Sequence, residues 1–315
     1  MGYILLRNCA KMPIVGIGTY MLKGDVLKQA LDFAIFKGYR HIDTALSYGN
    51  ESEIGEVVAD RLKNGTLRRK DLFVTTKVPP VYLAPPFVAQ SVEMSLENLK
   101  MQYVDMVLIH SPWGCINRGD GQLRPINQKG ERVMEHYDLL ETWKAFESVY
   151  NNKLAKNIGV SNFTANQIER ICQKAIIIPS NLQTECHVYL QQRRLRLYCA
   201  SRGIVVSAYA PLGAPASPYR DKQHPLLLED HVVEQLARKY KKSAAQILLN
   251  FLINNNIPVL PKSQNQNRLR ENLDVIDWTM SPEDTKLLLD LDCGVKYFMF
   301  DWAKRHPEYF ENEPF

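Results

Sequence analysis

The chain alternates short apolar runs with longer amphipathic stretches from near its start to near its end. The apolar runs read as strands and the amphipathic stretches as helices. The expected strands cover residues 14–18, 40–43, 72–77, 104–110, 156–160, 181–184, 204–208 and 257–260. The expected helices cover residues 25–37, 51–62, 87–100, 137–151, 164–175, 191–201, 230–254 and 265–273, with a further helix over 281–291. Eight strand-then-helix units within 315 residues predict an α/β fold, the (β/α)8 TIM barrel.

A doubly wound parallel sheet is the alternative to a barrel. Such a sheet usually has fewer strands and a glycine-rich first turn. Here Gly16 and Gly18 lack the third glycine of that motif, and the chain has no Walker loop. We therefore favour the barrel, and because no linker interrupts the alternation we expect one domain over residues 1–315.

Two long loops, at 112–136 and 211–229, follow expected strands. In a barrel both belong to the C-terminal face, where long ordered loops usually shape a substrate pocket. The alternative is that they are surface insertions without a function.

Composition narrows the possible partners and compartment. The net charge of +5 fits an ordinary solvated surface, and an anionic ligand is the alternative explanation. The basic stretch 192–196 is interpreted as the solvent-exposed face of a helix. We expect no nucleic-acid partner.

No apolar run is long enough to span a bilayer, and no secretory signal is evident. The six cysteines form no CxxC pair, which favours reduced thiols in a cytoplasmic protein. No HExxH or Cys–His spacing predicts a metal site.

Four polar residues stand at or just beyond the C-terminal ends of expected strands: Asp43, Tyr48, Lys77 and His110. In a parallel barrel these ends open onto one face, so the four should converge. A nearby ammonium lowers the pKa of a phenol, so Lys77 is expected to make Tyr48 a better acid. Asp43 is the natural counter-ion of Lys77, and His110 can donate a hydrogen bond to a carbonyl oxygen. Each residue alone would more often be structural; their joint placement indicates a catalytic centre.

Five segments of the chain resemble the aldo-keto reductase superfamily, closest to the branch with aldose and aldehyde reductases and hydroxysteroid dehydrogenases. They are HIDTALSYGNESEIG, TTK at 75–77, LIHSP at 108–112, GVSNF at 159–163 and LPKS at 260–263. The resemblance implies a barrel that binds NADPH and reduces a small-molecule carbonyl substrate, as an alcohol dehydrogenase of the NADP⁺ type. It implies that Tyr48 protonates the carbonyl oxygen, that Lys77 and Asp43 tune Tyr48, and that His110 orients the carbonyl. It also suggests a monomer.

The resemblance also implies a set of cofactor contacts. Amide and hydroxyl groups suit the nicotinamide carboxamide, an aromatic ring suits the nicotinamide face, and cations suit the 2′-phosphate, which favours NADPH over NADH. The implied cofactor residues are Gly18, Thr19, Tyr20, Asp43, Ser161, Asn162, Gln183, Tyr209, Leu212, Lys262, Ser263, Arg268, Glu271 and Asn272.

The substrate pocket departs from the aldose reductase pattern. Tyr20, Pro79 and Ser111 stand where that enzyme has tryptophans, so we expect a wider and less apolar slot, with Trp113 replacing part of the lost ring. The implied pocket residues are Tyr20, Tyr48, Pro79, His110, Ser111, Trp113 and Cys293. A wider slot favours a bulky ketone such as a steroid or ecdysteroid; sugars and small aldehydes are the alternative. A non-catalytic NADPH-binding structural or regulatory protein is the alternative from another class.

Overall fold

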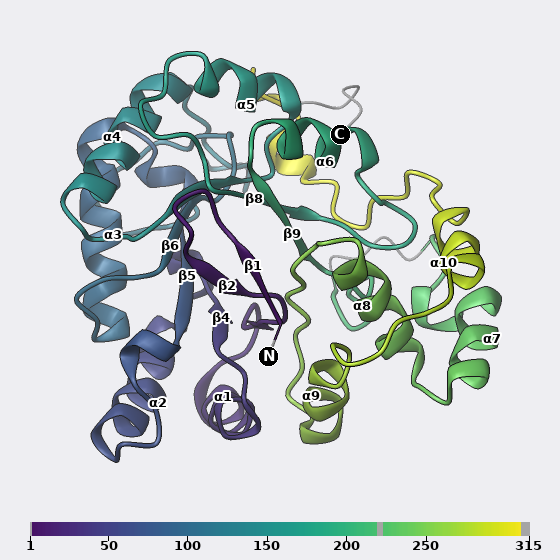
Figure 1. Cartoon of the computed structure of the whole chain (residues 1–315). Helices are drawn as coiled ribbons and strands as arrows, with labels where there is room; N and C mark the ends of the chain where they lie inside the picture. Colours follow the sequence, from purple (N-terminus) through teal and green to yellow (C-terminus); the bar gives the residue numbers. More distant parts are fainter. Residues whose placement is uncertain (1, 219–222, 310–315) are drawn as a thin grey trace.

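Seven of the expected strands form one parallel sheet in which sequential strands are neighbours (Figure 1). This computed structural model describes residues 2–218 and 223–309. The strands are β3 (Ile17–Gly18), β4 (His41–Asp43), β5 (Phe73–Val78), β6 (Met106–Ile109), β7 (Ile158–Ser161), β8 (Asn181–Glu185) and β9 (Val205–Tyr209). All six residues of β5 are buried, as expected for a parallel strand covered on both faces.

The expected strand at 257–260 closes the sheet into a barrel. Val259 forms parallel bridges with Val15 on one side and with Ala208 on the other. The Gly16 amide donates to the Val259 carbonyl oxygen at 2.9 Å, and the Leu260 amide donates to the Ala208 carbonyl oxygen at 3.1 Å. The predicted (β/α)8 barrel is therefore confirmed, with its eighth position held by isolated bridges and backbone hydrogen bonds.

Helices surround the strands (Figure 1). They are α1 (Gly24–Lys37), α2 (Glu51–Lys63), α3 (Pro85–Leu99), α4 (Leu139–Asn151), α5 (Ala165–Cys172), α6 (Arg193–Ser201), α7 (His231–Tyr240), α8 (Ala244–Asn254), α9 (Gln266–Leu273) and α10 (Pro282–Leu289). In α1 the buried positions recur at helical spacing, and the helix ends at Gly38, whose φ of 107° is readily adopted by glycine. Within the described part of the chain, no helix is long and apolar enough to cross a membrane.

The single helix expected over 230–254 is wrong. The segment forms two helices, α7 and α8, because Lys241 adopts a left-handed φ of 52° and Ser243 starts a new helix. Ser243 and Gln246 form a capping box, in which each side chain satisfies a backbone amide of the other residue. The Ser-x-x-Gln spacing in the sequence indicates a helix start at Ser243. The apolar periodicity continues across residues 230–254, however, and by itself predicts a single helix.

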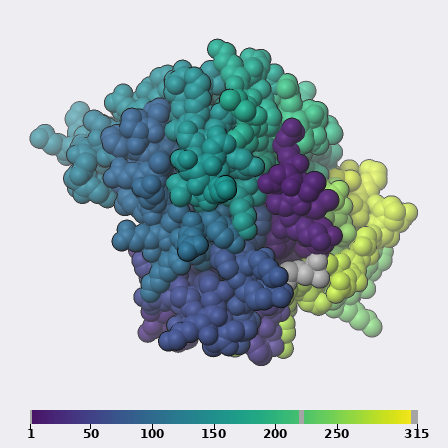
Figure 2. Space-filling view, turned by 60° about the vertical axis from the view of Figure 1, so that its left-hand side comes forward, coloured from purple at the N-terminus to yellow at the C-terminus, as the bar shows by residue number. Residues whose placement is uncertain are grey.

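An N-terminal hairpin covers one end of the barrel. Strands β1 (Tyr3–Leu5) and β2 (Lys11–Pro13) pair antiparallel. Leu6 and Met12 pack in a small cluster with Phe73 and Met106, which begin β5 and β6. The hairpin therefore covers the N-terminal end, and the purple N-terminal residues lie on the molecular surface beside the teal middle of the chain (Figure 2).

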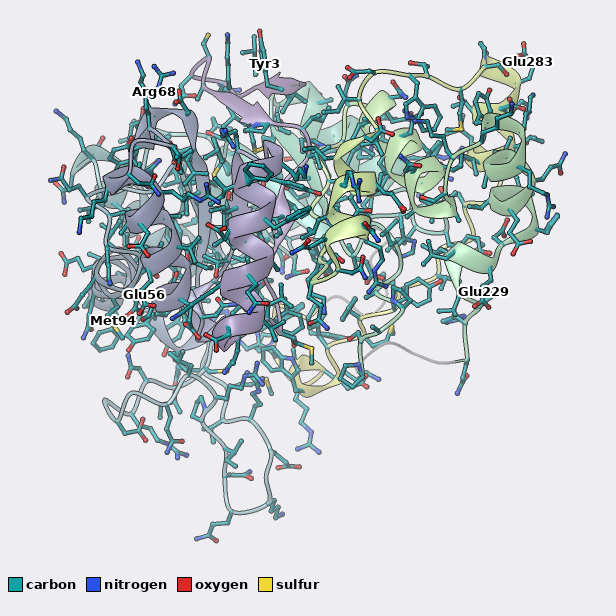
Figure 3. All side chains as sticks on the ribbon, turned by 90° about the horizontal axis from the view of Figure 1, so that it is seen from below. Tyr3, Glu56, Arg68, Met94, Glu229 and Glu283 are labelled. Carbon is teal, nitrogen blue, oxygen red and sulfur yellow. The ribbon has the colours of Figure 1, made fainter. Side chains whose placement is uncertain are left out.

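The opposite end of the barrel carries the long loops. With Tyr3 of the hairpin at the top of the view, the 112–136 loop extends beyond the rest of the molecule at the bottom (Figure 3). Antiparallel bridges between Cys115 and Met134 and between Ile126 and Arg132 give this loop an ordered frame. The 112–136 loop is thus an ordered part of the C-terminal face of the barrel.

Replacing Ser243 with alanine should lower the free energy of unfolding by about 1 kcal/mol, because the amide of Gln246 loses its capping acceptor. Urea denaturation followed by circular dichroism measures the change. Ser148→Ala is the matched control, because Ser148 is an exposed serine inside α4 and loses the same hydroxyl without losing a cap. Equal changes in both variants would contradict the assigned role of the cap.

Candidate active site

A buried ion pair lies at the C-terminal ends of β4 and β5. The Lys77 ammonium donates to both carboxylate oxygens of Asp43, at 2.9 and 2.7 Å, and to the Thr44 carbonyl oxygen at 2.9 Å. Lys77 is 1% exposed and Asp43 4%. Burial lowers the pKa of Lys77, while the charge of Asp43 opposes that shift. The carboxylate thus holds a desolvated ammonium in one place.

Tyr48 lies against this pair, at the end of the 3-10 helix η1 (Leu46–Tyr48) that follows β4. Its hydroxyl is 3.3 Å from the Lys77 nitrogen. Burial raises the pKa of Tyr48 well above its ordinary value, and the charges of Asp43 and Tyr20 raise it further. The expected lowering of this pKa by Lys77 is therefore not the net effect, because Asp43 neutralises the ammonium and burial disfavours the phenolate. The phenol is fully protonated in this site.

His110 faces Tyr48 from the end of β6, with the two rings nearly perpendicular and their centroids 5.7 Å apart. Its Nδ1 lies 3.3 Å from the Ser47 hydroxyl oxygen. Burial lowers the pKa of His110 to about 3, and the positive charges of Lys77, Arg124 and Arg132 lower it further. The imidazole is therefore neutral at physiological pH and keeps one N–H to donate. The structure thus brings all four predicted catalytic residues together.

Several of the predicted cofactor residues join the same hydrogen-bond network. Gln183 on β8 donates to Asp43 at 2.7 Å. Asn162 donates to the His110 carbonyl oxygen at 2.9 Å and accepts from the Tyr209 hydroxyl at 2.8 Å. Ser161 ends β7 beside Asn162, whose amide lies 3.3 Å from the serine hydroxyl. These amide and hydroxyl groups from three neighbouring strand ends fit a carboxamide ligand, which has both donors and acceptors.

The residues that follow β3 border the catalytic centre. The Thr19 hydroxyl donates to the Asp43 carbonyl oxygen at 2.9 Å, and the rings of Tyr20 and Tyr48 lie 5.0 Å apart. A side chain at Gly18 would place its Cβ 2.8 Å from the Leu260 carbonyl oxygen, so the barrel closure requires glycine there. Gly18 therefore has a structural role in addition to the implied cofactor role.

A second group of predicted cofactor residues lies at the start of α9. Lys262 precedes α9 and Arg268 lies in its first turn, and burial and the positive charge of Arg268 lower the pKa of Lys262. Among the residues described, neither has a carboxylate partner within salt-bridge distance. Ser263 and Asn272 are buried and Glu271 is partly buried in the same segment, while Leu212 is partly buried after β9. Paired cations at a helix start fit a phosphate group.

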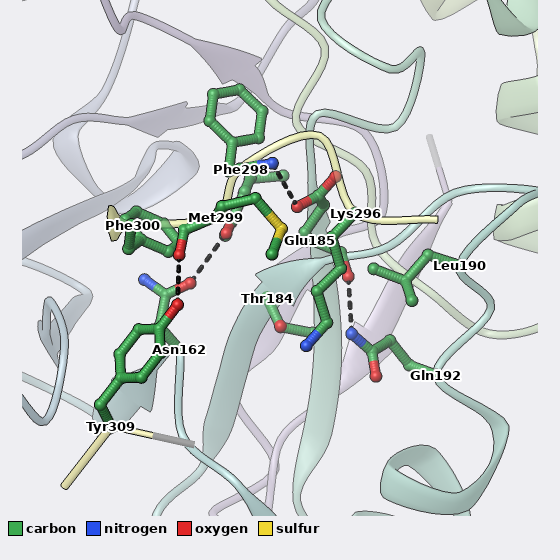
Figure 4. Close-up of a pocket in the computed structure, with 11 residues that line it drawn as sticks. Asn162, Thr184, Glu185, Leu190, Gln192, Lys296, Phe298, Met299, Phe300 and Tyr309 are labelled. Atoms are coloured by element: carbon green, nitrogen blue, oxygen red, sulfur yellow. Dashed lines mark hydrogen bonds between the residues drawn. The ribbon is translucent and has the colours of Figure 1, made fainter. Parts of the chain in front are cut away.

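A cavity opens beside Asn162 and Tyr209, under the C-terminal segment (Figure 4). It is lined by Asn162, Thr184, Glu185, Leu190, Gln192, Tyr209, Lys296, Phe298, Met299, Phe300 and Tyr309. Glu185 accepts hydrogen bonds from the backbone amides of Tyr297, at 2.7 Å, and Phe298, at 3.2 Å. Burial lowers the pKa of Lys296 to about 8. One side of this cavity is therefore formed by the C-terminal segment and the other by the ends of β7, β8 and β9 and the residues that follow β8.

None of the predicted pocket residues, Trp113 and Cys293 included, is among the residues that line this cavity. Trp113 is fully buried, packs on Phe300 and Trp302, and donates to the Glu308 carbonyl oxygen at 3.2 Å. It does not line the cavity but supports the segment that does. Cys293 is exposed and lies outside the cavity lining, with its amide donating to the Tyr189 carbonyl oxygen. That these two side chains belong to a substrate pocket stays a prediction.

Two further predicted pocket residues, Pro79 and Ser111, are close in sequence to the catalytic residues Lys77 and His110. Pro79 follows β5 directly and Ser111 follows His110, and both are buried.

In the part of the chain that the structure describes, no group of three or more His, Cys, Asp or Glu side chains is arranged to hold a metal ion.

Sequence reasoning missed several residues of the cavity. Glu185 stands at the end of β8, so the strand-end criterion that identified Asp43 would also have found it. Lys296, Phe298 and Met299 belong to an irregular segment with no periodic signal, and only the three-dimensional structure brings them to the barrel mouth.

Comparisons with known proteins agree with this fold. The sequence model described as "Aldo/keto reductase family" matches residues 15–292. The "Aldo-keto reductase family 1 member A1" of Gallus gallus is 36% identical over 323 residues, covering 99% of this chain and 98% of that protein. "Prostaglandin F synthase 1" of Bos taurus is 37% identical over 304 residues, covering 95% and 94%. The solved structure of the aldose reductase from Schistosoma japonicum superposes with a TM-score of 0.92 at 33% identity, covering 99% of this chain and 100% of that chain.

The closed parallel barrel together with these matches defines this protein as a TIM-barrel oxidoreductase. The chain belongs to the aldo/keto reductase family.

Replacing Asp43 with asparagine should lower the free energy of unfolding by about 3–5 kcal/mol, because the Lys77 ammonium would remain buried without a counter-charge. Adding Lys77→Met should restore most of that loss, because no unpaired charge then remains. Thermal and urea unfolding of both variants measure the difference.

Glu141→Gln is the matched control, since the Glu141–Lys144 pair is equally short, at 2.7 Å, but exposed to solvent. It should leave stability unchanged. A double variant that is as unstable as Asp43→Asn alone would show that the unpaired charge is not the cause.

Proposed function

We propose that this protein reduces an aldehyde or ketone carbonyl to an alcohol, with NADPH as the hydride source and Tyr48 as the proton donor. The observation that carries the proposal is the position of the Tyr48 hydroxyl, 3.3 Å from an ammonium that is held by both oxygens of Asp43. A phenol in this environment is protonated before the reaction and has a cation beside it when the proton leaves.

The chain's own residues supply the acid and the orientation. Tyr48 gives its proton to the carbonyl oxygen, and the Lys77 ammonium stabilises the phenolate that remains. In the tautomer whose Nδ1 accepts from the Ser47 hydroxyl, the other ring nitrogen of His110 carries the proton and donates it in a hydrogen bond to the same oxygen. Tyr48 and His110 thus both point a donor at the oxygen on which negative charge develops.

The donor groups around the site fit a nicotinamide dinucleotide with a phosphate on its ribose. When bound, NADPH supplies the hydride. Gln183 and Asn162 would hold the carboxamide, and the ring of Tyr209 would support the nicotinamide face. Lys262 and Arg268 would hold the phosphate, since two close cations without a carboxylate partner suit an anion.

The pocket favours a bulky ketone over a small aldehyde or a sugar. Tyr20, Pro79 and Ser111 have smaller side chains than the tryptophans that aldose reductase has at these positions, so they leave a wider pocket. Turnover of a steroid ketone and of short aldehydes, compared side by side, tests this choice.

Tyr48→Phe should reduce turnover by a factor of at least 100, because the site loses its proton donor. NADPH binding should remain within about twofold, since the ring and its packing are retained. The decrease of NADPH absorbance with a nitrobenzaldehyde measures turnover, and fluorescence titration measures binding. Tyr3→Phe, at an exposed tyrosine, is the control. Activity above a few per cent in Tyr48→Phe would exclude Tyr48 as the donor.

Arg268→Met should raise the dissociation constant of NADPH by about tenfold or more, since a charge-assisted contact to the phosphate is lost. The dissociation constant of NADH should stay within about twofold. Arg270→Met is the matched control, because Arg270 is exposed on the same helix. A parallel loss of affinity for both cofactors would assign Arg268 to the stability of α9 instead.

A further inference from the structure

Lys296 is a nucleophilic side chain in the wall of the cavity, and the proposed reduction does not use it. Its side chain extends from the C-terminal segment toward Thr184, near the end of β8 (Figure 4). The residue is partly buried. A compound that occupies the cavity therefore meets a primary amine there.

The backbone around Lys296 is fixed by hydrogen bonds on both sides. The Val295 amide donates to the Tyr189 carbonyl oxygen at 3.2 Å. The Tyr297 amide donates to the Glu185 carboxylate at 2.7 Å, and Tyr297 is 1% exposed. The backbone of Lys296 therefore keeps its place in the cavity wall, and its amine moves only within the reach of one side chain.

The surroundings of this amine favour its neutral form. The apolar part of the cavity lining consists of Leu190, Phe298, Met299 and Phe300. Burial lowers the pKa of Lys296 to about 8, although the charge of Glu185 opposes that shift. At about pH 7, roughly one molecule in ten then has a neutral amine at this position, against roughly one in 2,500 for an ordinary lysine. The neutral amine is the form that attacks a carbonyl carbon.

The cavity lies directly beside the catalytic centre. Asn162 lines the cavity and donates to the His110 carbonyl oxygen at 2.9 Å. Tyr209 also lines it and donates to Asn162 at 2.8 Å. A carbonyl compound in this cavity is thus held close to Lys296, and confinement of two reactants in one space raises their effective concentration.

We propose that Lys296 is a site of covalent modification by aldehydes, at which the amine forms an imine with an aldehyde that occupies the cavity. The lone pair of the nitrogen attacks the carbonyl carbon, and one proton moves from nitrogen to oxygen to give a carbinolamine. The carbinolamine then loses its hydroxyl group and the remaining N–H proton as water, and the C=N bond forms. No oxidant or reductant takes part, and addition of water reverses the reaction.

Two consequences of this chemistry make the proposal specific. Ketones should react more slowly than aldehydes at the same amine, because their carbonyl carbon is more hindered and less electrophilic. The modification also needs no nicotinamide cofactor, so it is independent of the proposed reduction.

The test incubates the purified protein with benzaldehyde at about pH 7, without a nicotinamide cofactor. Sodium cyanoborohydride converts each imine into a stable secondary amine, and peptide mass spectrometry measures the modified fraction of each lysine over time. Lys296 should be modified at least about tenfold faster than Lys153, which is exposed. Acetophenone, the matched ketone, should modify Lys296 at least about tenfold more slowly than benzaldehyde does.

Unfolding is the first control. In guanidinium chloride Lys296 and Lys153 should react at similar rates, because the difference between them comes from the cavity. A preference for Lys296 that persists in the unfolded chain would show that the cavity is not its cause and would overturn the proposal.

Lys262 is the second control, because burial also lowers its pKa but it does not line the cavity. It should react more slowly than Lys296. Faster modification of Lys262, or equal rates at Lys296 and Lys153 in the folded protein, would overturn the proposal. Lys296→Arg should remove the fast phase of total benzaldehyde incorporation, since a guanidinium forms no imine under these conditions. A fast phase that remains in this variant would assign the reactive amine to another position.

Discussion

The buried ion pair between Lys77 and Asp43 is the interaction on which the rest of the site depends. It joins the C-terminal ends of two neighbouring strands, and Gln183 from the far side of the barrel donates to the same carboxylate. Buried ion pairs add little net stability, because desolvation offsets most of their attraction. The main contribution of the pair is therefore to the geometry of the site and not to the free energy of unfolding. It fixes the Lys77 ammonium beside the Tyr48 hydroxyl in a buried site.

Part of the cavity wall is built apart from this centre, although Asn162 and Tyr209 line the cavity and also belong to the hydrogen-bond network around His110. The C-terminal segment is held to the barrel by the Glu185 carboxylate, which accepts from two of its backbone amides, and by Trp113, which packs beneath it. Among the residues that the structure describes, neither anchor forms a hydrogen bond with Lys77 or Asp43. Side chains such as Lys296 and Phe300 can thus vary without a change in the Lys77–Asp43 pair.

Much of the fold and of the polar centre was predictable because both follow periodic rules. Alternating strands and helices predict the barrel, and the strand-end rule then places Asp43, Lys77 and His110 on one face. The remainder depends on contacts between distant segments. The burial of Trp113 depends on where the last residues return, and the direction of the Tyr48 pKa depends on the balance of burial against one charge. The break at Lys241 was signalled only by a capping pair within an otherwise continuous helical pattern.

Burial sets the protonation of the centre in a way that suits an acid rather than a base. It keeps Tyr48 protonated and His110 neutral, so both groups offer a proton to an incoming oxygen. The Lys77 ammonium does not need to ionise the phenol in advance, since Asp43 balances its charge until the proton leaves. Once negative charge forms on Tyr48, the ammonium at 3.3 Å becomes its nearest cation. In the reduction proposed above, the same geometry would hold the proton before the reaction and stabilise its loss during it, which is the electrostatic requirement of carbonyl reduction.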